Sequence, residues 1–182
     1  YTVATTDDTT FTFALTLSGT SDGAEVLTLT GSVYDSEANY TAISTTVSFN
    51  DLTAPTISTA LAINADNTSA TITFSEPVYK SDGSTRLTAT ELVPTIASGT
   101  ATLSSYTVST TDDTTFTFAL TLSGTSDGSE VLTLTGTVYD SGAANNTAIS
   151  TTVSFNDLTS PGISTALAVN ANNTSATITF SE

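Results

Sequence analysis

The chain has 182 residues, with 18 acidic side chains against two basic ones, no histidine and no cysteine, and a net charge of −16 at pH 7. Proteins that bind duplex nucleic acid or anionic lipid need clustered lysine and arginine, so this composition excludes nucleic acid and argues against anionic lipid. The absence of cysteine excludes disulfides and cysteine-based zinc sites, whereas an acidic surface favours metal cations as partners.

The chain begins with a segment that it later repeats. Residues 5–23 recur letter for letter at 110–128, and Tyr1 matches Tyr106, an offset of 105 residues. A period of this length suits an independently folding domain and is too long for one turn of a solenoid. The motifs "NDLTAP" and "NDLTSP" mark the boundaries between repeats and therefore predict three domains. These are the C-terminal half of one repeat (1–51), a complete repeat (52–157) and the first part of the next repeat (158–182).

Both ends of the chain therefore fall inside a repeat, and the first residue is Tyr1 rather than methionine. We expect the sequence to be a segment of a longer or processed polypeptide. It contains no uninterrupted apolar run of about 18 residues, so direct membrane insertion of this segment is not predicted.

Within the complete repeat, apolar and polar residues alternate along almost every hydrophobic stretch, which is the pattern of half-buried strands. In "SATITFS" Ile72 and Phe74 are expected to face inward, and in "FTFALTL" Phe116 and Phe118 are expected to do so. Abundant threonine disfavours helices because its branched Cβ is stiff. The seven predicted strands are 56–63, 69–75, 93–97, 100–109, 114–122, 131–138 and 147–155.

The connection 76–91 is expected to be irregular, with a short helical turn at "TATELV" (88–93). Short strands separated by Gly, Asp, Asn and Ser clusters are typical of an antiparallel sandwich. The fold class predicted for the chain is therefore all-β, as tandem Ig-like antiparallel β-sandwich domains of about seven strands each.

Three motifs occur in a fixed order along the repeat: "TAPTIS" (53–58), "ITFSEPVY" (72–79) and "VYDSGAANN" (138–146). Together they resemble the bacterial Ig-like repeats that occur in tandem in large cell-surface adhesins and extracellular fibres. The resemblance covers the whole chain. The family often has an Asp-x-x-Gly-Asn loop, and here that loop is longer, with Gly142 separated from Asn145.

The resemblance implies an extracellular or cell-surface location and a structural role. The implied partners are neighbouring repeats of the same or an identical chain, and a glycan or host surface would be contacted through other domains.

Because successive antiparallel strands run in opposite directions, their order predicts at which end of the sandwich the acidic residues gather. The loops after the second, fourth and sixth strands return to the end where the domain begins. A linker carboxylate from the preceding repeat reaches the same joint, as would Asp22 and Glu25 of that repeat. The candidate ligands are Asp51, Glu76, Asp112, Asp113, Asp140, Asn145 and, for the next joint, Asp157. Carboxylate and amide oxygens without histidine or cysteine suit Ca²⁺ better than zinc. The alternative is that these residues only form turns and keep the surface soluble.

Other candidate sites are less specific. Exposed aromatic residues that could bind a glycan or another surface are Tyr40, Tyr79 and Tyr106. Threonine rows are expected to be ordinary solvent-facing strand surface, and "SGTSDGSE" (123–130) is expected to be a turn. Asn-x-Ser/Thr sequons, which can accept a glycan in secreted proteins, occur at Asn39, Asn67, Asn145, Asn172 and Asn173.

Catalysis is not predicted, because the chain lacks histidine and cysteine and has one lysine. Three functional hypotheses remain in this order: a structural spacer, a filament subunit completed by strands of neighbouring chains, and a repeat that itself binds a surface.

Overall fold

A computed structural model describes residues 1–5, 7 and 9–181. The regular structure of these residues consists of β-strands paired in antiparallel sheets, without a helix. None of the described residues therefore forms a helix long and apolar enough to cross a membrane. The chain divides into two compact units, which we call unit 1 (Tyr1–Ala54) and unit 2 (Pro55–Glu182) and describe separately.

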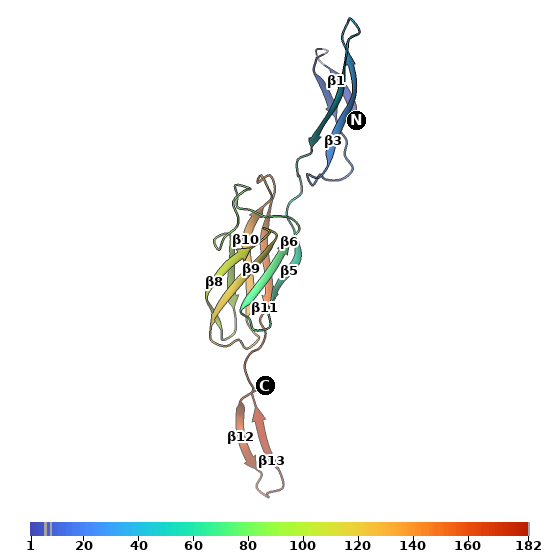
Figure 1. The fold of residues 1–182 in the computed structure, drawn as a ribbon. Coiled ribbons are helices and arrows are strands. Elements are labelled where there is room, and N and C mark those ends of the chain that lie inside the picture. Colours follow the sequence, from blue (N-terminus) through green and yellow to red (C-terminus); the bar gives the residue numbers. More distant parts are fainter. Residues whose placement is uncertain (6, 8, 182) are drawn as a thin grey trace. The chain divides into compact units, whose positions relative to one another are not determined.

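Unit 2 contains a seven-stranded sandwich (Figure 1). One sheet has the strand order β5-β6-β9-β8 and the other has the order β11-β10-β7. This is the arrangement of constant-type Ig domains, in which strands ABED face strands CFG, so the predicted fold class is confirmed. The strands are β5 (Ile57–Ile63), β6 (Ser69–Phe74), β7 (Leu92–Ala97), β8 (Thr102–Thr110), β9 (Thr115–Ser123), β10 (Val131–Tyr139) and β11 (Asn146–Ser154).

The core of this sandwich comes from the alternating apolar residues of the facing sheets. Ile72 pairs with Phe116 and Ala70 with Phe118 across β6 and β9, and all four side chains are buried. The ring of Phe74 packs edge-on against Phe116, with centroids 5.9 Å apart. Each large apolar side chain buried in this way contributes about 1.5–3 kcal/mol to the free energy of folding.

At 88–91 the β6–β7 connection forms one hydrogen-bonded turn rather than the predicted helical turn at 88–93. The Glu91 backbone N–H donates to the Thr88 carbonyl at 3.3 Å, and Glu91 Oε2 accepts from the Thr88 N–H at 2.8 Å. The Glu91 side chain thus caps the Thr88 N–H, and the Thr88 hydroxyl also donates to Glu91 Oε2 at 2.7 Å. No helix follows, because Leu92 already pairs with Gly136 of β10 as the first residue of β7.

Unit 1 contains two small sheets, formed by β1 (Thr2–Thr5) with β2 (Phe11–Ala14) and by β3 (Val26–Tyr34) with β4 (Tyr40–Ser48). By sequence these strands match β8 to β11 of unit 2. The match extends to the pairing: Val26 lies opposite Ser48, as Val131 lies opposite Ser154.

Unit 1 has no counterparts of β5, β6 and β7 among its described residues. The apolar side chains that those strands bury in the complete sandwich are therefore exposed in unit 1. Phe11 is 50% exposed, whereas its counterpart Phe116 is fully buried.

Unit 2 ends in a hairpin of β12 (Ile163–Val169) and β13 (Ala176–Phe180), whose sequence matches β5 and β6. Ile163 lies opposite Phe180, as Ile57 lies opposite Phe74, and both hairpins carry register shifts at matching positions. Every residue of β12 and β13 is exposed.

Candidate functional site

The loops that carry most of the predicted ligands do meet at one end of the complete sandwich. The backbone N–H of Val78 donates to the Asp113 carbonyl at 2.8 Å, joining the β6–β7 connection to the β8–β9 turn. The Gly142 N–H donates to the Gly83 carbonyl at 3.0 Å, joining the same connection to the β10–β11 loop. Pro55 lies at this end too, since its carbonyl accepts a hydrogen bond from Thr147 Oγ1.

Asp140 holds the β10–β11 loop closed. Its side chain is buried, and its two oxygens accept hydrogen bonds from the Asn145 N–H at 3.0 Å and from Asn145 Nδ2 at 2.6 Å. Asp35 and Asn39 make the same pair of contacts in unit 1, both at 2.8 Å, although that loop is one residue shorter. The Asp–Asn pair therefore closes loops of either length.

Asp112 and Asp113 point in different directions. Asp112 Oδ1 accepts hydrogen bonds from the N–H groups of Thr115 at 2.8 Å and Thr114 at 3.0 Å, which hold its pKa below the usual range. Asp113 has a left-handed backbone (φ 59°) and a nearly buried side chain. Arg86 Nε lies 3.2 Å from Asp113 Oδ1, in an ion pair that is not aligned as a hydrogen bond.

Both basic residues of the chain, Lys80 and Arg86, lie in the β6–β7 connection and are paired with acidic groups. Lys80 Nζ lies 3.1 Å from Glu91 Oε1. Glu76 is half-buried near the start of the same connection. These two ion pairs were not predicted from the sequence, because no local pattern marks partners that are separated in the chain by a turn, as Lys80 and Glu91 are, or by two strands, as Arg86 and Asp113 are.

The two linker carboxylates make the same pair of hydrogen bonds. Asp51 Oδ1 accepts hydrogen bonds from the Thr53 N–H at 2.8 Å and from Thr53 Oγ1 at 2.7 Å. Asp157 Oδ1 accepts the corresponding pair from Thr159 at the same two distances. Both aspartates thus stabilise the turn that follows the last strand of a repeat.

Among residues 1–5, 7 and 9–181, no three Asp, Glu, His or Cys side chains are grouped as metal ligands. Asp112, Asp113 and Asp140 are instead each engaged by groups of their own end of the sandwich. Ca²⁺ binding at joints, with ligands from consecutive repeats, stays a prediction.

A buried glutamate that sequence reasoning missed lies at the opposite end of the sandwich. Glu130 Oε1 accepts hydrogen bonds from the N–H groups of Thr100 at 2.9 Å and Ala101 at 2.8 Å. Glu130 Oε2 accepts from Ser126 Oγ at 2.6 Å. Burial raises the pKa of Glu130, but the hydrogen bonds from Ser126, Ala101 and Thr100 outweigh it and lower the pKa to about 2. Only the turn within 123–130 was predicted, since two of the donors lie about 30 residues earlier.

A second buried polar contact involves Asn67, in the β5–β6 turn. Asn67 Nδ2 donates to the Asn156 carbonyl at 2.8 Å, and Asn67 Oδ1 accepts from the Asn156 N–H at 3.0 Å. Asn156 Nδ2 also donates to the Asn64 carbonyl at 2.9 Å. The Asn67 side chain is fully buried, so this sequon cannot carry a sugar while the contact is intact.

The other sequons differ in accessibility. Asn145 is half-buried, and its Nδ2 is bound to Asp140. Asn39, Asn172 and Asn173 are exposed, and glycosylation at them stays a prediction.

The three aromatic candidates also differ in exposure. Tyr40 is exposed, with its ring centroid 5.8 Å from that of Tyr34. Tyr79 is half-buried. Tyr106 packs against the core, and its hydroxyl donates to the Ala89 carbonyl at 2.7 Å, so the expectation that it is exposed was wrong.

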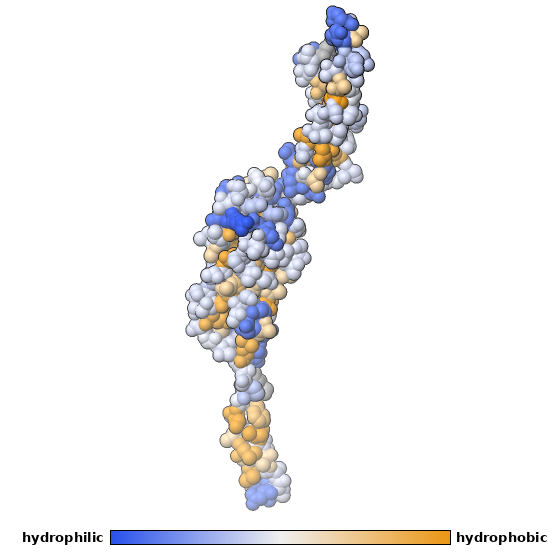
Figure 2. Space-filling model, viewed as in Figure 1, coloured by the Kyte–Doolittle hydropathy of each residue, from blue (hydrophilic) through white to orange (hydrophobic). Residues whose placement is uncertain are grey.

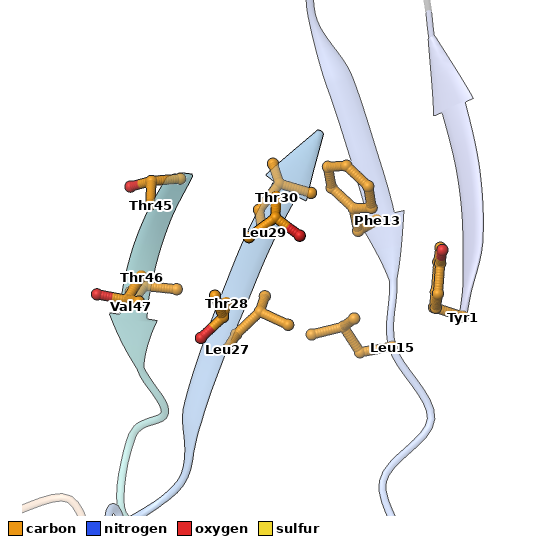
Figure 3. A pocket seen from close by; sticks show the side chains of 10 residues that line it. All are labelled: Tyr1, Phe13, Leu15, Leu27, Thr28, Leu29, Thr30, Thr45, Thr46 and Val47. Carbon is orange, nitrogen blue, oxygen red and sulfur yellow. The ribbon is translucent and has the colours of Figure 1, made fainter. Parts of the chain in front are cut away.

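An apolar depression lies within unit 1, between its two sheets, and we call it the open groove. Its volume is about 350 Å³. Figure 3 shows Phe13 and Leu15 on one side and Leu27, Leu29 and Val47 on the other, with Tyr1 at one edge.

Comparisons with protein-family models, with curated proteins and with solved structures found no match to the chain. The function proposed below therefore rests on the sequence and the geometry alone.

Proposed function

We propose that the chain is a structural segment of an extracellular stalk or filament, in which Ig-like sandwiches follow one another as spacers. The observation that carries the proposal is the repetition of one module down to its pairing register, in β3–β4 and again in β10–β11. A spacer needs no specificity in each module, because its reach grows with copy number alone.

The surface of the complete sandwich supports a passive role. Its buried polar groups, such as Glu130 and Asn67, hydrogen-bond to backbone groups and close loops and turns. The high negative charge favours solubility and disfavours association between neighbouring stalks.

Binding by the repeats themselves is the weaker candidate. The exposed pair Tyr34 and Tyr40 of unit 1 is matched in unit 2 by Tyr139 and Asn146. An aromatic surface that changes from one repeat to the next is poorly suited to a contact shared by every repeat.

The proposal is tested by joining one, two and four copies of residues 52–157 and measuring small-angle X-ray scattering. We expect the maximum dimension to increase by a constant step for each added copy. A dimension that stops growing would mean that the repeats fold back on one another, and the spacer function would be rejected. Immobilised glycans, tested with the same three proteins, would reveal a binding function by capture that strengthens with copy number.

A further inference from the structure

Both residues after which a trypsin-like protease would cut lie in the connection between β6 and β7. The chain has two basic side chains, Lys80 and Arg86, and both belong to residues 75–91. The linker sequences "NDLTAP" and "NDLTSP", in which Leu52 and Leu158 are exposed, carry neither lysine nor arginine. Exposed linkers and loop tips are the segments that proteases cut most readily. The target bonds of this protease class are therefore confined to one connection of the sandwich.

We propose that the β6–β7 connection is a protected cleavage site for proteases that cut after lysine or arginine. Cleavage there adds water across a peptide bond and leaves a carboxylate on Lys80 or Arg86 and an amine on Ser81 or Leu87. The folded sandwich keeps both bonds from the protease. They become accessible when the connection detaches while the strands stay paired. The inference goes beyond the spacer role and does not depend on it.

The backbone around the first bond, between Lys80 and Ser81, is held in a tight turn. The Lys80 N–H donates to the Thr85 carbonyl at 2.9 Å, and the Lys80 carbonyl accepts from the Gly83 N–H at 2.8 Å. Lys80 Nζ lies 3.1 Å from Glu91 Oε1. A trypsin-like protease binds the basic side chain in a pocket and attacks the carbonyl of the same residue. Both groups of Lys80 are engaged, so the turn has to open before this bond can be cut.

The second bond is protected by the residue that follows it. The Arg86 side chain is 59% exposed, so a protease can reach its guanidinium group. Leu87, however, belongs to the hydrophobic core and is 5% exposed. The Arg86 backbone also forms a bridge with Tyr79, which exchanges two backbone hydrogen bonds with Tyr139 of β10. A protease can bind the chain on both sides of this bond only after Leu87 has left the core.

The connection is also fastened to the neighbouring loops. The Val78 N–H donates to the Asp113 carbonyl, and the Gly83 carbonyl accepts from the Gly142 N–H. Gly83 lies so close to the β10–β11 loop that a Cβ there would overlap the backbone of Ala143. These contacts belong to single turns and loops, and such segments open at a lower free energy than the strands of a core. Detachment of the connection alone is therefore the easiest route to the two bonds.

Once detached, the connection is within reach of a protease. Figure 2 shows hydrophilic side chains gathered at the end of the sandwich from which the connection emerges in Figure 1. Residues 81–82 and 84–86 are exposed even in the folded state. The rate of cleavage is therefore set by how often the connection opens and not by access to this end of the sandwich.

Cleavage would interrupt the chain between its two linkers without removing a strand. Both bonds lie between β6 and β7, so cutting both releases only residues 81–86. The β5–β6 hairpin would stay paired with β9, where Ile72 lies opposite Phe116. A cut sandwich would keep its shape at rest, but a pull on its linkers would then be carried by the noncovalent contact between β6 and β9. Protection of the connection thus preserves the covalent continuity of the module.

Digestion of the full chain by trypsin is the first test, with a synthetic peptide of residues 76–91 as the unfolded reference in the same buffer. We expect the folded chain to be cut about 100-fold more slowly than the peptide, or slower still. Mass spectrometry should identify the products as residues 1–80, 81–86 and 87–182. Equal rates for the chain and the peptide would overturn the proposal. They would leave the spacer role untouched, because the scattering test of that role involves no cleavage.

A lysine placed in a linker is the matched control. In a chain with Leu158→Lys, trypsin should cut after position 158 while the β6–β7 connection of the same molecule stays intact. Equal resistance of the linker would show that the connection has no protection of its own, and the proposal would be rejected.

Three substitutions then distinguish detachment of the connection from unfolding of the whole sandwich. Glu91→Gln removes the partner of Lys80, and Gly83→Ala displaces the β10–β11 loop. Asn67→Ala weakens the opposite end of the sandwich without contacting the connection. For the same loss of melting temperature, we expect the first two substitutions to speed cleavage about tenfold more than Asn67→Ala. Equal acceleration by all three would mean that cleavage requires global unfolding, which would overturn the local protection proposed for this connection.

Discussion

At the scale of single residues, the complete sandwich relies on buried polar side chains that connect segments distant in sequence. Glu130 and Asn67 are both fully buried, and both satisfy backbone groups of another loop. Neither role could be predicted from the sequence, since a hydrogen bond between residues 89 positions apart leaves no local periodicity. Glu130 stands in "SDGSE", which is also the residue pattern of an ordinary turn.

We expect Glu130→Gln to destabilise the complete sandwich by about 3 kcal/mol. Hydrogen bonds to a buried charged acceptor are lost, and the NH₂ group of the new glutamine points at groups that are themselves donors. Urea unfolding followed by circular dichroism measures the change. Glu25→Gln is the matched control: Glu25 is exposed and accepts from Ser21 Oγ at 2.7 Å, so its replacement should have little effect. Equal effects of the two substitutions would contradict the role assigned to Glu130.

The same carboxylate predicts how stability depends on pH. The pKa of Glu130 is about 2 in the folded state, below its ordinary value of 4.5, so the unfolded state binds the proton more readily. The stabilisation is therefore complete above about pH 4.5 and is lost as the pH falls from there towards 2. The melting temperature of the wild type should fall over this pH range. The melting temperature of the Glu130→Gln variant should fall less steeply over the same range. A wild-type melting temperature that does not change between pH 5 and 2 would contradict the assignment.

At the scale of elements, the strands could be predicted because the pattern of threonine and apolar residues is so regular. The predicted strand 131–138 is β10 to within one residue, and 56–63 is β5 to within one residue. The helical turn at 88–93 was wrong for a physical reason: Glu91 does cap the Thr88 N–H in a hydrogen-bonded turn, but the next residues pair with β10. Local capping favoured a helix, and the sheet pairing prevailed.

The packing of the β6–β7 connection on the β10–β11 loop yields a prediction at this scale. A Cβ on Gly83 would lie 2.1 Å from the backbone nitrogen of Ala143, whereas a Cβ on Gly142 would meet nothing within 4 Å. Both glycines have positive φ. We expect Gly83→Ala to cost about 3 kcal/mol from strain and displacement of the loop, and Gly142→Ala to cost about 1 kcal/mol from strain alone. Thermal unfolding of both variants measures the difference, and equal costs would show that the two segments are not packed together in solution.

At the scale of the whole molecule, the candidate Ca²⁺ sites belong to the joints between complete repeats. A protein of two joined copies of residues 52–157 contains such a joint, whereas one copy does not. With a Kd of about 0.1–1 mM, typical of extracellular Ca²⁺ modules, 5 mM Ca²⁺ should stabilise the two-copy protein by about 1–2 kcal/mol, or about 5 °C in melting temperature. An equal shift in the single copy would place the ion outside the joint, and no shift in either protein would contradict the predicted Ca²⁺ sites.

The chain enters and leaves the complete sandwich at opposite ends. Pro55 is bonded to Thr147 at the start of β11, and Asn156, just after β11, is bonded to the β5–β6 turn at the far end. Tension applied through the two linkers would therefore act along the strands, and the backbone hydrogen bonds between them would be loaded together in shear rather than opened one after another. In a stalk exposed to flowing liquid, this geometry would let each module resist drag with the full width of its sheets.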